Sequence, residues 1–379
     1  MAGRTSSAPR GIALLGSTGS IGVSTLKVLE RHPDRFRLVT MTGGKNRALL
    51  EEQVARWKPS YAGLAQADGK NGVATGPACL VEAATHPDVD VVVNAVVGAA
   101  GLDATLAALR AGKRVALANK ETLVMAGELV AEAARQGGGE LVPVDSEHSA
   151  VLQCLDGKDA APARLILTAS GGPFRTWEPA RIAAATREDA LKHPTWQMGA
   201  KITVDSATLA NKALEVIEAH FLFGLPYDAI EVVVHPQSVI HAFVEFADGS
   251  VLAQLGFPTM ELPILYALTH PGRVADAGVR RFDPVAAGNL SFEPVRPDLF
   301  RAFALGLAAA RRGGTAPAAF NAANEVAVAA FLDGRIPFGR IAEVIERVLD
   351  RHPDEAARDL DTVRAADARA RATATAALG

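Results

Sequence analysis

The sequence has few cysteines, no long apolar run and no excess of charge of one sign. Its 379 residues include two cysteines, Cys79 and Cys154, which are far apart and fit no metal or redox spacing. No apolar run reaches the length of a membrane span, and no secretory signal pattern follows the short polar start. The formal net charge of −3 gives no field that would gather nucleic acid or an anionic membrane. We therefore expect a cytoplasmic protein without a nucleic-acid or membrane partner.

The first pattern that is present is a glycine-rich turn between a strand and a helix. Residues 12–15 form a short apolar strand, residues 16–22 read Gly-Ser-Thr-Gly-Ser-Ile-Gly, and an apolar periodicity of the helical type follows. Glycines in this context let the backbone approach a pyrophosphate, which then lies against the free N–H groups of the helix. The spacing differs from Gly-x-Gly-x-x-Gly, and a plain tight turn is the alternative. The pattern predicts a dinucleotide-binding fold.

The second predicted strand, residues 37–41, lacks the acid that usually holds the ribose of NAD(H). No Asp or Glu occurs between the end of this strand and Glu51, and Lys45 and Arg47 occupy this region instead. Positive charge suits a ribose 2'-phosphate, so NADP(H) is preferred over NAD(H). The alternative is that both cations only solubilise the surface.

Polar residues follow two further predicted strands of this region. The strand over residues 114–118 runs into Asn119-Lys120-Glu121, and the strand over residues 141–144 runs into Asp145 and Glu147. Open α/β sheets bind their ligands at the carboxyl ends of parallel strands. We therefore expect both groups to lie at the ligand-binding edge of one sheet.

Asp145 and Glu147 form a pair of carboxylates with Ser146 between them. On an extended segment, side chains two residues apart point the same way, so both carboxylates could converge on one cation. Carboxylate oxygens are suited to a hard divalent ion such as Mg²⁺ or Mn²⁺. The alternative is a solvated loop with two incidental acids. We interpret the neighbouring His148 as structural.

The next region predicts a turn and a lid. A strand over residues 164–168 ends in the turn Ser170–Phe174, whose backbone N–H groups beside a hydroxyl are suited to an oxyanion. Residues 189–200 are bracketed by proline and glycine and contain Trp196 and Met198. This composition predicts a mobile lid, with an ordinary ordered loop as the alternative.

A helix is predicted next, with Asp205 or Ser206 as its N-cap. On this helix Asn211 and Glu215 are four residues apart and share a face, with Lys212 at its flank. An amide, an ammonium group and a carboxylate can together hold a phosphate and a metal. The alternative is a solvated Lys/Glu face.

Three strands follow, over residues 231–234, 239–246 and 250–255, with Asp248-Gly249 as a hairpin turn. Such a sheet could pair across a two-fold axis, so a homodimer is expected. Beyond it, a segment rich in proline and glycine leads into a C-terminal stretch with helical spacing.

These patterns predict an α/β protein of several domains, as a chain of this length requires. The predicted parts are a Rossmann-like doubly wound cofactor domain (1–145), a catalytic and dimerisation α+β domain with a mixed sheet (146–270), a linker (271–297) and a C-terminal α-helical domain (298–379). The only polar cluster predicted in the last domain is Asn321, Asn324 and Glu325.

Taken together and in order, these motifs closely resemble the 1-deoxy-D-xylulose 5-phosphate reductoisomerase family of the non-mevalonate isoprenoid pathway. The similarity runs from about residue 11 through the C-terminal helices. The motifs that carry it are the glycine turn 16–22, Asn119-Lys120-Glu121, Asp145-Ser146-Glu147-His148, Ser170-Gly171-Gly172-Pro173-Phe174, His193-Pro194-Thr195-Trp196, and Asp205-Ser206-Ala207-Thr208 with Asn211-Lys212 and Glu215. The resemblance implies conversion of the sugar phosphate 1-deoxy-D-xylulose 5-phosphate to 2-C-methyl-D-erythritol 4-phosphate, with NADPH and Mg²⁺, Mn²⁺ or Co²⁺.

The resemblance also implies roles for individual residues. The metal ligands would be Asp145, Glu147 and Glu215, so the metal would bridge the domain boundary. The catalytic residues would be these three and Lys120, which would contact the reacting part of the substrate. NADPH would be held by Thr18, Gly19, Ser20, Ile21, Gly44, Lys45, Asn46, Asn119, Glu121 and Gly199. The substrate would be held by Lys120, Ser146, Glu147, Ser170, His193, Ser206, Asn211, Lys212 and Glu215, and its phosphate by Ser170, Ser206, Asn211 and Lys212. Trp196 and Met198 lie in the family's flexible lid.

Two departures from the family pattern are minor. Ser149 replaces an expected asparagine, and Ala169 is one of two small residues seen there; neither disturbs a ligand. The rival enzyme class is another NADP-dependent dehydrogenase of small metabolites, of the homoserine type, which gives no reason for three carboxylates on two domains. A semialdehyde dehydrogenase would need a catalytic cysteine, and a regulatory NADP-sensing module would need no lid.

Overall fold

The computed structural model describes residues 8–66, 69, 72–158 and 160–379. The chain forms two compact units. The first comprises Met1–Thr122, Val130–Ser149 and Thr259–Arg280, and the second comprises Leu123–Leu129, Ala150–Pro258 and Arg281–Gly379. Within the described residues, none of the helices combines the length and apolar character that crossing a membrane requires.

The first unit contains a parallel sheet of seven strands in the order β4-β3-β2-β1-β5-β6-β7. The strands are β1 (Arg10–Leu15), β2 (Phe36–Gly43), β3 (Tyr61–Leu64), β4 (Ala74–Thr75), β5 (Val91–Asn94), β6 (Arg114–Leu117) and β7 (Glu140–Pro143). The strand order runs outward from β1 in both directions, which defines a doubly wound sheet whose ligand site lies at the carboxyl ends near β1 and β5. The predicted Rossmann-like fold is confirmed.

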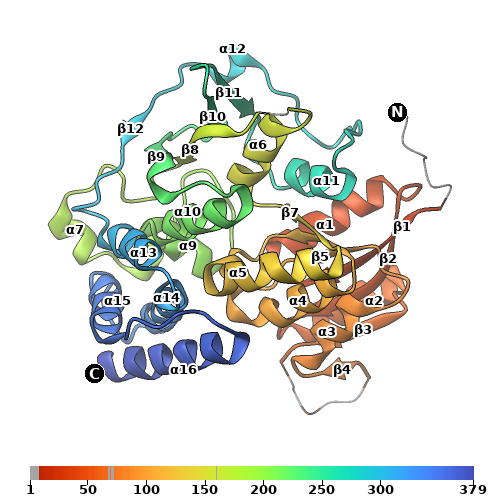
Figure 1. Ribbon diagram of the computed structural model, residues 1–379, viewed down its shortest axis with the longest axis horizontal. Coiled ribbons are helices and arrows are strands. Elements are labelled where there is room, and N and C mark those ends of the chain that lie inside the picture. The colour runs from red at the N-terminus through yellow and green to blue at the C-terminus, as the bar shows by residue number, and fades with distance from the viewer. Residues whose placement is uncertain (1–7, 67–68, 70–71, 159) are drawn as a thin grey trace. The chain divides into compact units, whose positions relative to one another are not determined.

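Helices cover both faces of this sheet (Figure 1). They are α1 (Ser20–Arg31), α2 (Arg47–Trp57), α3 (Ala78–Thr85), α4 (Leu102–Arg110), α5 (Lys120–Gly137), α11 (Glu261–Thr269) and the short 3-10 turn Gly98–Gly101. Right-handed crossovers place α1 and α2 on one face and α3, α4 and α5 on the other. The helix α11 contacts α1, β6 and β7, so it covers the part of the first face that the crossovers leave bare.

An ion-pair cluster explains why residues 259–280 belong to the first unit. Arg31 at the end of α1 lies 2.7 Å from Glu261 and 2.8 Å from Asp276. The side chain of His32 lies 3.2 Å from the same Asp276. This part of the chain therefore docks on α1, although the sequence predicted that residues up to 270 belong to the catalytic domain.

The second unit contains a mixed sheet of five strands in the order β11-β10-β8-β9-β12. The strands are β8 (Pro162–Ala169), β9 (Ile230–Val234), β10 (Ile240–Phe246), β11 (Val251–Leu255) and β12 (Glu293–Pro294). Only β8 and β9 are paired in parallel. The hairpin between β10 and β11 turns at Gly249, whose φ is +83°, and Asp248 Oδ1 accepts a hydrogen bond from the Ser250 amide at 2.9 Å. The predicted mixed sheet and its hairpin are both present.

Eight helices of the second unit share one large hydrophobic core. They are α7 (Pro179–Ala183), α8 (Arg187–Ala190), α9 (Ala200–Ala207), α10 (Ala210–Phe223), α13 (Arg301–Arg312), α14 (Ala316–Leu332), α15 (Arg340–Arg351) and α16 (Leu360–Ala377). The short helix α12 (Pro284–Ala287) has no buried residue. Helix α6 (Ser146–Leu155) and the 3-10 turn Tyr227–Ala229 complete the list of helical elements. Figure 1 shows α14, α15 and α16 packed side by side.

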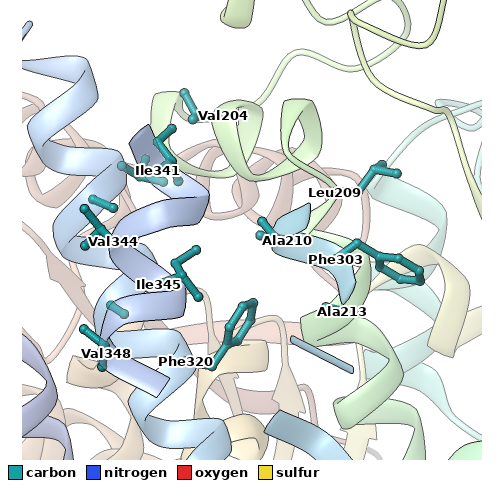
Figure 2. Close-up of a cluster of buried hydrophobic side chains, with 14 of the residues drawn as sticks. Val204, Leu209, Ala210, Ala213, Phe303, Phe320, Ile341, Val344, Ile345 and Val348 are labelled. Carbon is teal, nitrogen blue, oxygen red and sulfur yellow. The ribbon is translucent and has the colours of Figure 1, made fainter. Parts of the chain in front are cut away.

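Side chains of the C-terminal helices and of α9 and α10 meet in this core. Figure 2 shows Val204 of α9, Ala210 and Ala213 of α10, and Phe320 of α14 around the same cluster. The packing is close enough that a Cβ at Gly306 would lie 2.5 Å from the Cβ of Ala213. The helical C-terminal region predicted from the sequence is present, but it shares its hydrophobic core with the helices before the predicted linker.

Candidate active site

The glycine turn after β1 contains two glycines that the protein's own packing requires. Gly16 has a φ of +86°, and a Cβ on it would lie 2.5 Å from the Ala95 carbonyl oxygen. A Cβ on Gly22 would lie 2.6 Å from the backbone of Ser17. Gly19 differs, because the nearest atom to its Cβ would be at an ordinary 3.4 Å. Gly16 and Gly22 thus shape the turn, while Gly19, exposed at the N-cap of α1, leaves the turn's outer side open.

The glycine turn lies against the end of β2. The amides of Gly16 and Ser17 donate hydrogen bonds of 2.9 and 2.8 Å to the Thr42 carbonyl oxygen. A Cβ on Gly43 would lie 3.3 Å from the Thr18 methyl group. The structure therefore brings together the two predicted cofactor-binding segments, Thr18–Ile21 and Gly44–Asn46.

Gly44 and Gly199 are glycines that the protein's own structure does not require. Neither has a positive φ, and a Cβ on either one would meet no atom within 4 Å. Both are exposed, Gly44 after β2 and Gly199 at the N-cap of α9. A residue with a side chain would fit at both places in the protein alone. Close approach of a ligand is one physical reason for a glycine at such a position, and the cofactor contacts of Gly44 and Gly199 stay predictions.

The cations after β2 have unequal surroundings. Lys45 is exposed, whereas Arg47 begins α2 and lies 3.2 Å from Glu51. Asn46 is the N-cap of α2, and its Oδ1 accepts a hydrogen bond from the Leu49 amide at 3.2 Å. Lys45 is therefore the better placed of the two cations for a ribose phosphate, because a carboxylate already partly neutralises Arg47.

Asn119 and Glu121 are both buried. The side-chain amide of Asn119 forms hydrogen bonds with backbone carbonyl groups and with the carboxylate of Glu121. Asn119 Nδ2 donates to the carbonyl oxygens of Val96 at 2.7 Å and Gly98 at 2.9 Å, and it lies 3.0 Å from Glu121 Oε2. The cofactor contact of Asn119 stays a prediction, and the Nδ2 hydrogens already bond to oxygens of the protein. The amide shapes the turn after β5, at the ligand-binding edge of the sheet.

In the first unit the buried Lys120 forms an ion pair with the partly buried Asp145. One carboxylate oxygen of Asp145 also lies within 4.8 Å of one of Glu147, and the Ser146 hydroxyl donates to Glu147. The expectation that these residues lie on an extended segment is wrong. Helix α6 begins at Ser146, whose amide donates to Asp145 Oδ1 at 3.0 Å, so the carboxylates are grouped at a helix N-terminus. This position stabilises negative charge.

His148 is fully buried on the same helix. Its Nδ1 lies 4.0 Å from Asp145 Oδ2, which is longer than a hydrogen bond. The interpretation of His148 as a structural residue stays a prediction.

Ser170, His193 and Ser206 come together at the end of β8. His193 Nε2 lies 3.0 Å from Ser170 Oγ and 3.1 Å from Ser206 Oγ. The Ser170 hydroxyl also accepts a hydrogen bond from the Gly172 amide at 3.2 Å. Three side chains that lie on different segments of the sequence thus form one polar group.

The hydrogen bonds define the tautomer of His193. Its Nδ1 accepts from the amides of Thr195 at 3.1 Å and Trp196 at 2.9 Å, so the proton of the neutral ring is on Nε2. Burial lowers the pKa of His193 from 6.5 to about 4. A neutral ring therefore donates its Nε2 hydrogen toward the two serine hydroxyls.

The predicted lid lies between α8 and α9. Trp196 and Met198 are partly buried, and the Trp196 ring centroid lies 6.2 Å from that of His241. His193 Nδ1 accepts hydrogen bonds from two backbone amides of this segment. His193 therefore connects the backbone of the predicted lid with the two serine side chains. The mobility of the segment stays a prediction.

Asn211, Lys212 and Glu215 form a second polar group, on α10. Asn211 Nδ2 and Lys212 Nζ both donate to the Glu215 carboxylate, and Lys212 Nζ also donates to the Thr168 carbonyl oxygen at 2.5 Å. Lys212 is 4% exposed and Glu215 is 1% exposed. The predicted shared face of this helix is present, and it is buried, so the solvated Lys/Glu face is wrong.

The predicted N-caps are also wrong. Asp205 and Ser206 lie inside α9, and the chain breaks after it at Leu209, whose φ is +57°. The Asp205 carboxylate binds Lys201 Nζ at 2.8 Å and Asn324 Nδ2 at 2.8 Å. Sequence reasoning missed this connection. The spacing of four between Lys201 and Asp205 was a usable signal, whereas nothing local indicated Asn324.

The fold and these groups define a class of protein: a Rossmann-fold dehydrogenase with a separate substrate-binding unit. Three family models match the chain. They are described as 1-deoxy-D-xylulose 5-phosphate reductoisomerase (residues 12–127) and as two C-terminal domains of the same enzyme (residues 141–223 and 255–373). The chain belongs to the 1-deoxy-D-xylulose 5-phosphate reductoisomerase family.

Individual relatives agree with this assignment. The 1-deoxy-D-xylulose 5-phosphate reductoisomerase of Geobacillus kaustophilus is 51% identical, over 95% of this chain and 97% of its own length. That of Burkholderia multivorans is 53% identical, over 95% and 94%. The crystal structure of DOX-P reductoisomerase with NADPH, fosmidomycin and magnesium is similar with a TM-score of 0.92 and 40% identity, over 97% of this chain and 98% of that chain. The Zymomonas mobilis enzyme with NADPH gives a TM-score of 0.88 and 43% identity, over 98% and 99%.

Proposed function

We propose that this protein converts 1-deoxy-D-xylulose 5-phosphate to 2-C-methyl-D-erythritol 4-phosphate with NADPH and a divalent metal. The observation that carries the proposal is membership of the reductoisomerase family over nearly the whole chain. A homoserine dehydrogenase-like activity is not favoured, because the family assignment covers the cofactor unit and the substrate unit alike.

The reaction explains which residue types the site contains. Rearranging the carbon skeleton of a hydroxyketone requires a polarised ketone and an acidified neighbouring hydroxyl, and the aldehyde formed must be reduced before it escapes. A bound divalent cation supplies the Lewis acidity for the first two tasks. Hydride transfer belongs to the nicotinamide, while the protein supplies position and charge.

We propose Asp145, Glu147 and Glu215 as the metal ligands. Their carboxylates are the hard oxygen donors that Mg²⁺ and Mn²⁺ prefer. In each unit a lysine forms an ion pair with one of the proposed ligands: Lys120 with Asp145 in the first unit, and Lys212 with Glu215 in the second. These lysines balance negative charge that a cation would otherwise neutralise. Lys120 is also the residue proposed to contact the reacting part of the substrate.

We propose that NADPH binds along the glycine turn and the end of β2. The open positions at Gly19 and Gly44 support this site, and Gly199 supplies a third open position in the second unit. The proposed contacts are those implied by the family resemblance: Thr18, Gly19, Ser20, Ile21, Gly44, Lys45, Asn46, Asn119, Glu121 and Gly199.

The proposed phosphate site is the group of donors around the end of β8. Ser170, Ser206, Asn211 and Lys212 offer hydroxyl, amide and ammonium donors, and the neutral His193 orients both serine hydroxyls through Nε2–H. Because His193 already donates to these oxygens, each hydroxyl is free to direct its own hydrogen toward an anion. Ser146 is proposed as a further substrate contact.

The segment with Trp196 and Met198 is proposed as a lid over the bound substrate. A bulky apolar side chain there would exclude water from the reactive intermediate. The hydrogen bonds from two amides of this segment to His193 would couple the position of the segment to phosphate binding at the two serines.

We propose that the protein forms homodimers through the second sheet. Its edge strand β11 exposes Val251 and Leu252, which would be covered if two copies paired. Sedimentation velocity tests this proposal, and a purely monomeric protein would contradict it. Cys79 and Cys154 are buried and form no disulfide bond, which supports the expected location in the cytoplasm.

Turnover is tested by mixing purified protein with NADPH, Mn²⁺ or Mg²⁺ and 1-deoxy-D-xylulose 5-phosphate. We expect NADPH absorbance to fall only when all components are present. Loss of the signal on addition of EDTA, and its return with excess metal, checks the metal requirement. No consumption of NADPH in the complete mixture would overturn the proposal.

A further inference from the structure

Asp205 is a buried carboxylate that the proposed chemistry does not use. It lies inside α9 and is 1% exposed. A carboxylate removed from water in this way is costly unless partners satisfy its oxygens. Lys201 Nζ lies 2.8 Å from Oδ2, and Asn324 Nδ2 lies 2.8 Å from Oδ1. Asn324 belongs to α14, 119 residues further along the chain, and is fully buried.

Helix α9 carries parts of the proposed site at both of its ends. Gly199 precedes its first residue, and Ser206 directly follows Asp205. A Cβ on Gly172 would lie 2.7 Å from the Ser206 carbonyl oxygen, so the helix lies directly against the turn that carries Ser170. A small rotation of α9 would therefore move the Ser206 hydroxyl away from His193 and Ser170.

The helix has little cohesion of its own. It contains eight residues, about two turns, and a helix this short depends on tertiary contacts. Val204 packs in the hydrophobic core beside Ile341 (Figure 2), which holds α9 close to its neighbours. Apolar packing is non-directional, whereas a hydrogen bond has a preferred angle. The bond from Asn324 therefore adds a directional constraint on the rotation of α9 about its axis.

We infer that Asn324 is a positioning residue for the phosphate site. It acts through Asp205, and it holds the Ser206 hydroxyl in place from the C-terminal helices. The Lys201–Asp205 ion pair extends this support to the first turn of α9, next to Gly199 at the end of the lid. The inference rests on the proposed function, which assigns Ser206 to the substrate phosphate.

The test compares two asparagines of the same helix. Asn321 is also fully buried on α14, but its Nδ2 donates to Glu325 on α14 itself at 2.9 Å. We expect Asn324→Ala to raise the dissociation constant for inorganic phosphate, and the KM for the sugar phosphate, about tenfold or more. The NADPH dissociation constant should stay unchanged. Asn321→Ala should lower thermal stability to a similar degree and leave the phosphate constant unchanged. Equal phosphate affinity in the two variants would overturn the inference.

Exchanging the carboxylate and the amide between positions 205 and 324 distinguishes a positioning role of Asn324 from a general loss of stability. Asn324→Asp places two carboxylates together and should weaken phosphate binding further. The double variant D205N/N324D restores the hydrogen bond with donor and acceptor exchanged, and it should recover most of the lost affinity. Failure of the double variant to improve on Asn324→Asp would also overturn the inference.

Phosphate affinity is measured by titrating tryptophan fluorescence, which needs no turnover. If the wild-type protein fails to consume NADPH but the variants differ in phosphate affinity as expected, only the proposed reaction is refuted. If turnover is present and the phosphate constants do not differ, only the role of Asn324 is refuted.

Discussion

Single buried charges of the site each have a partner within the same unit. Lys120 is paired with Asp145, Lys212 with Glu215, and Lys201 with Asp205. Such pairs contribute little to folding stability, because the loss of hydration offsets most of the attraction. Removing one partner is different, since it leaves an uncompensated charge in a dry environment. We interpret these pairs as features kept for binding and chemistry rather than for stability.

The proposed cofactor site can be tested by adding a single methyl group to one of its glycines. Gly44→Ala adds a Cβ that meets no protein atom, so folding stability should stay within about 1 kcal/mol of the wild-type value. NADPH should bind roughly tenfold more weakly, which corresponds to about 1.4 kcal/mol. Thermal unfolding and a fluorescence titration with NADPH measure the two effects.

Gly22→Ala is the matched comparison for Gly44→Ala. Its new Cβ would lie 2.6 Å from the Ser17 backbone, so stability and NADPH affinity should fall together. Unchanged NADPH affinity in Gly44→Ala would remove Gly44 from the cofactor site.

The ring of His193 should remain neutral well below the pH at which histidine usually titrates. Burial lowers its pKa from 6.5 to about 4. Between these values the unfolded chain binds a proton that the folded protein does not, so the stability contributed by this residue is lost as pH falls from 6.5 to 4. We expect the ring signals of His193 in NMR spectra, assigned with His193→Gln, to show no titration above about pH 5. A midpoint near 6.5 would contradict the buried, neutral ring.

At the scale of elements, α10 depends on the C-terminal helices that pack against it. Phe320 of α14 is fully buried in the shared core (Figure 2). Phe320→Ala should lower the free energy of unfolding of the second unit by about 3–5 kcal/mol, because the cavity cannot fully collapse. Denaturant unfolding followed by the fluorescence of Trp177 and Trp196 reports on this unit.

Val285→Ala serves as the control for Phe320→Ala. Val285 is 88% exposed, so its truncation should change stability by no more than about 0.5 kcal/mol. If Phe320→Ala costs no more than this control, the helices do not share a tightly packed core.

At the scale of the whole molecule, Glu215 allows a test of the proposed metal-ligand set. Glu215→Gln keeps the shape of the side chain and removes its charge. We expect metal-dependent turnover to fall at least about a hundredfold. Mutating a residue that only hydrogen-bonds to a metal ligand costs up to about a hundredfold, so losing the ligand itself should cost at least as much. NADPH affinity should be unchanged, because Glu215 is not among the proposed cofactor contacts.

Glu346→Gln, which removes an exposed charge on α15, is the control for Glu215→Gln. Its turnover should equal that of the wild type. Retained turnover in Glu215→Gln would remove this residue from the ligand set.

Several features of the fold and the site were predictable from the sequence, because they depend on local spacing. Strand, glycine turn and helix in succession predicted the doubly wound sheet. The spacing of four between Asn211 and Glu215 correctly predicted a shared helical face. Motif order identified the family. For the sheet and the helical face the deciding information lies within a few residues, since backbone geometry alone places those side chains.

Other features were decided by the tertiary structure. Only the packing of the chain shows that α6 begins at Ser146, that α11 completes the first unit, and that Asp205 is held by Asn324. A carboxylate in a helical sequence is compatible with a cap, a solvated surface or a buried bond. The sequence by itself determined the fold class, the family and the residue types of the site. Long-range packing decided which of those residues are buried and what they contact, because burial depends on elements that are distant along the chain.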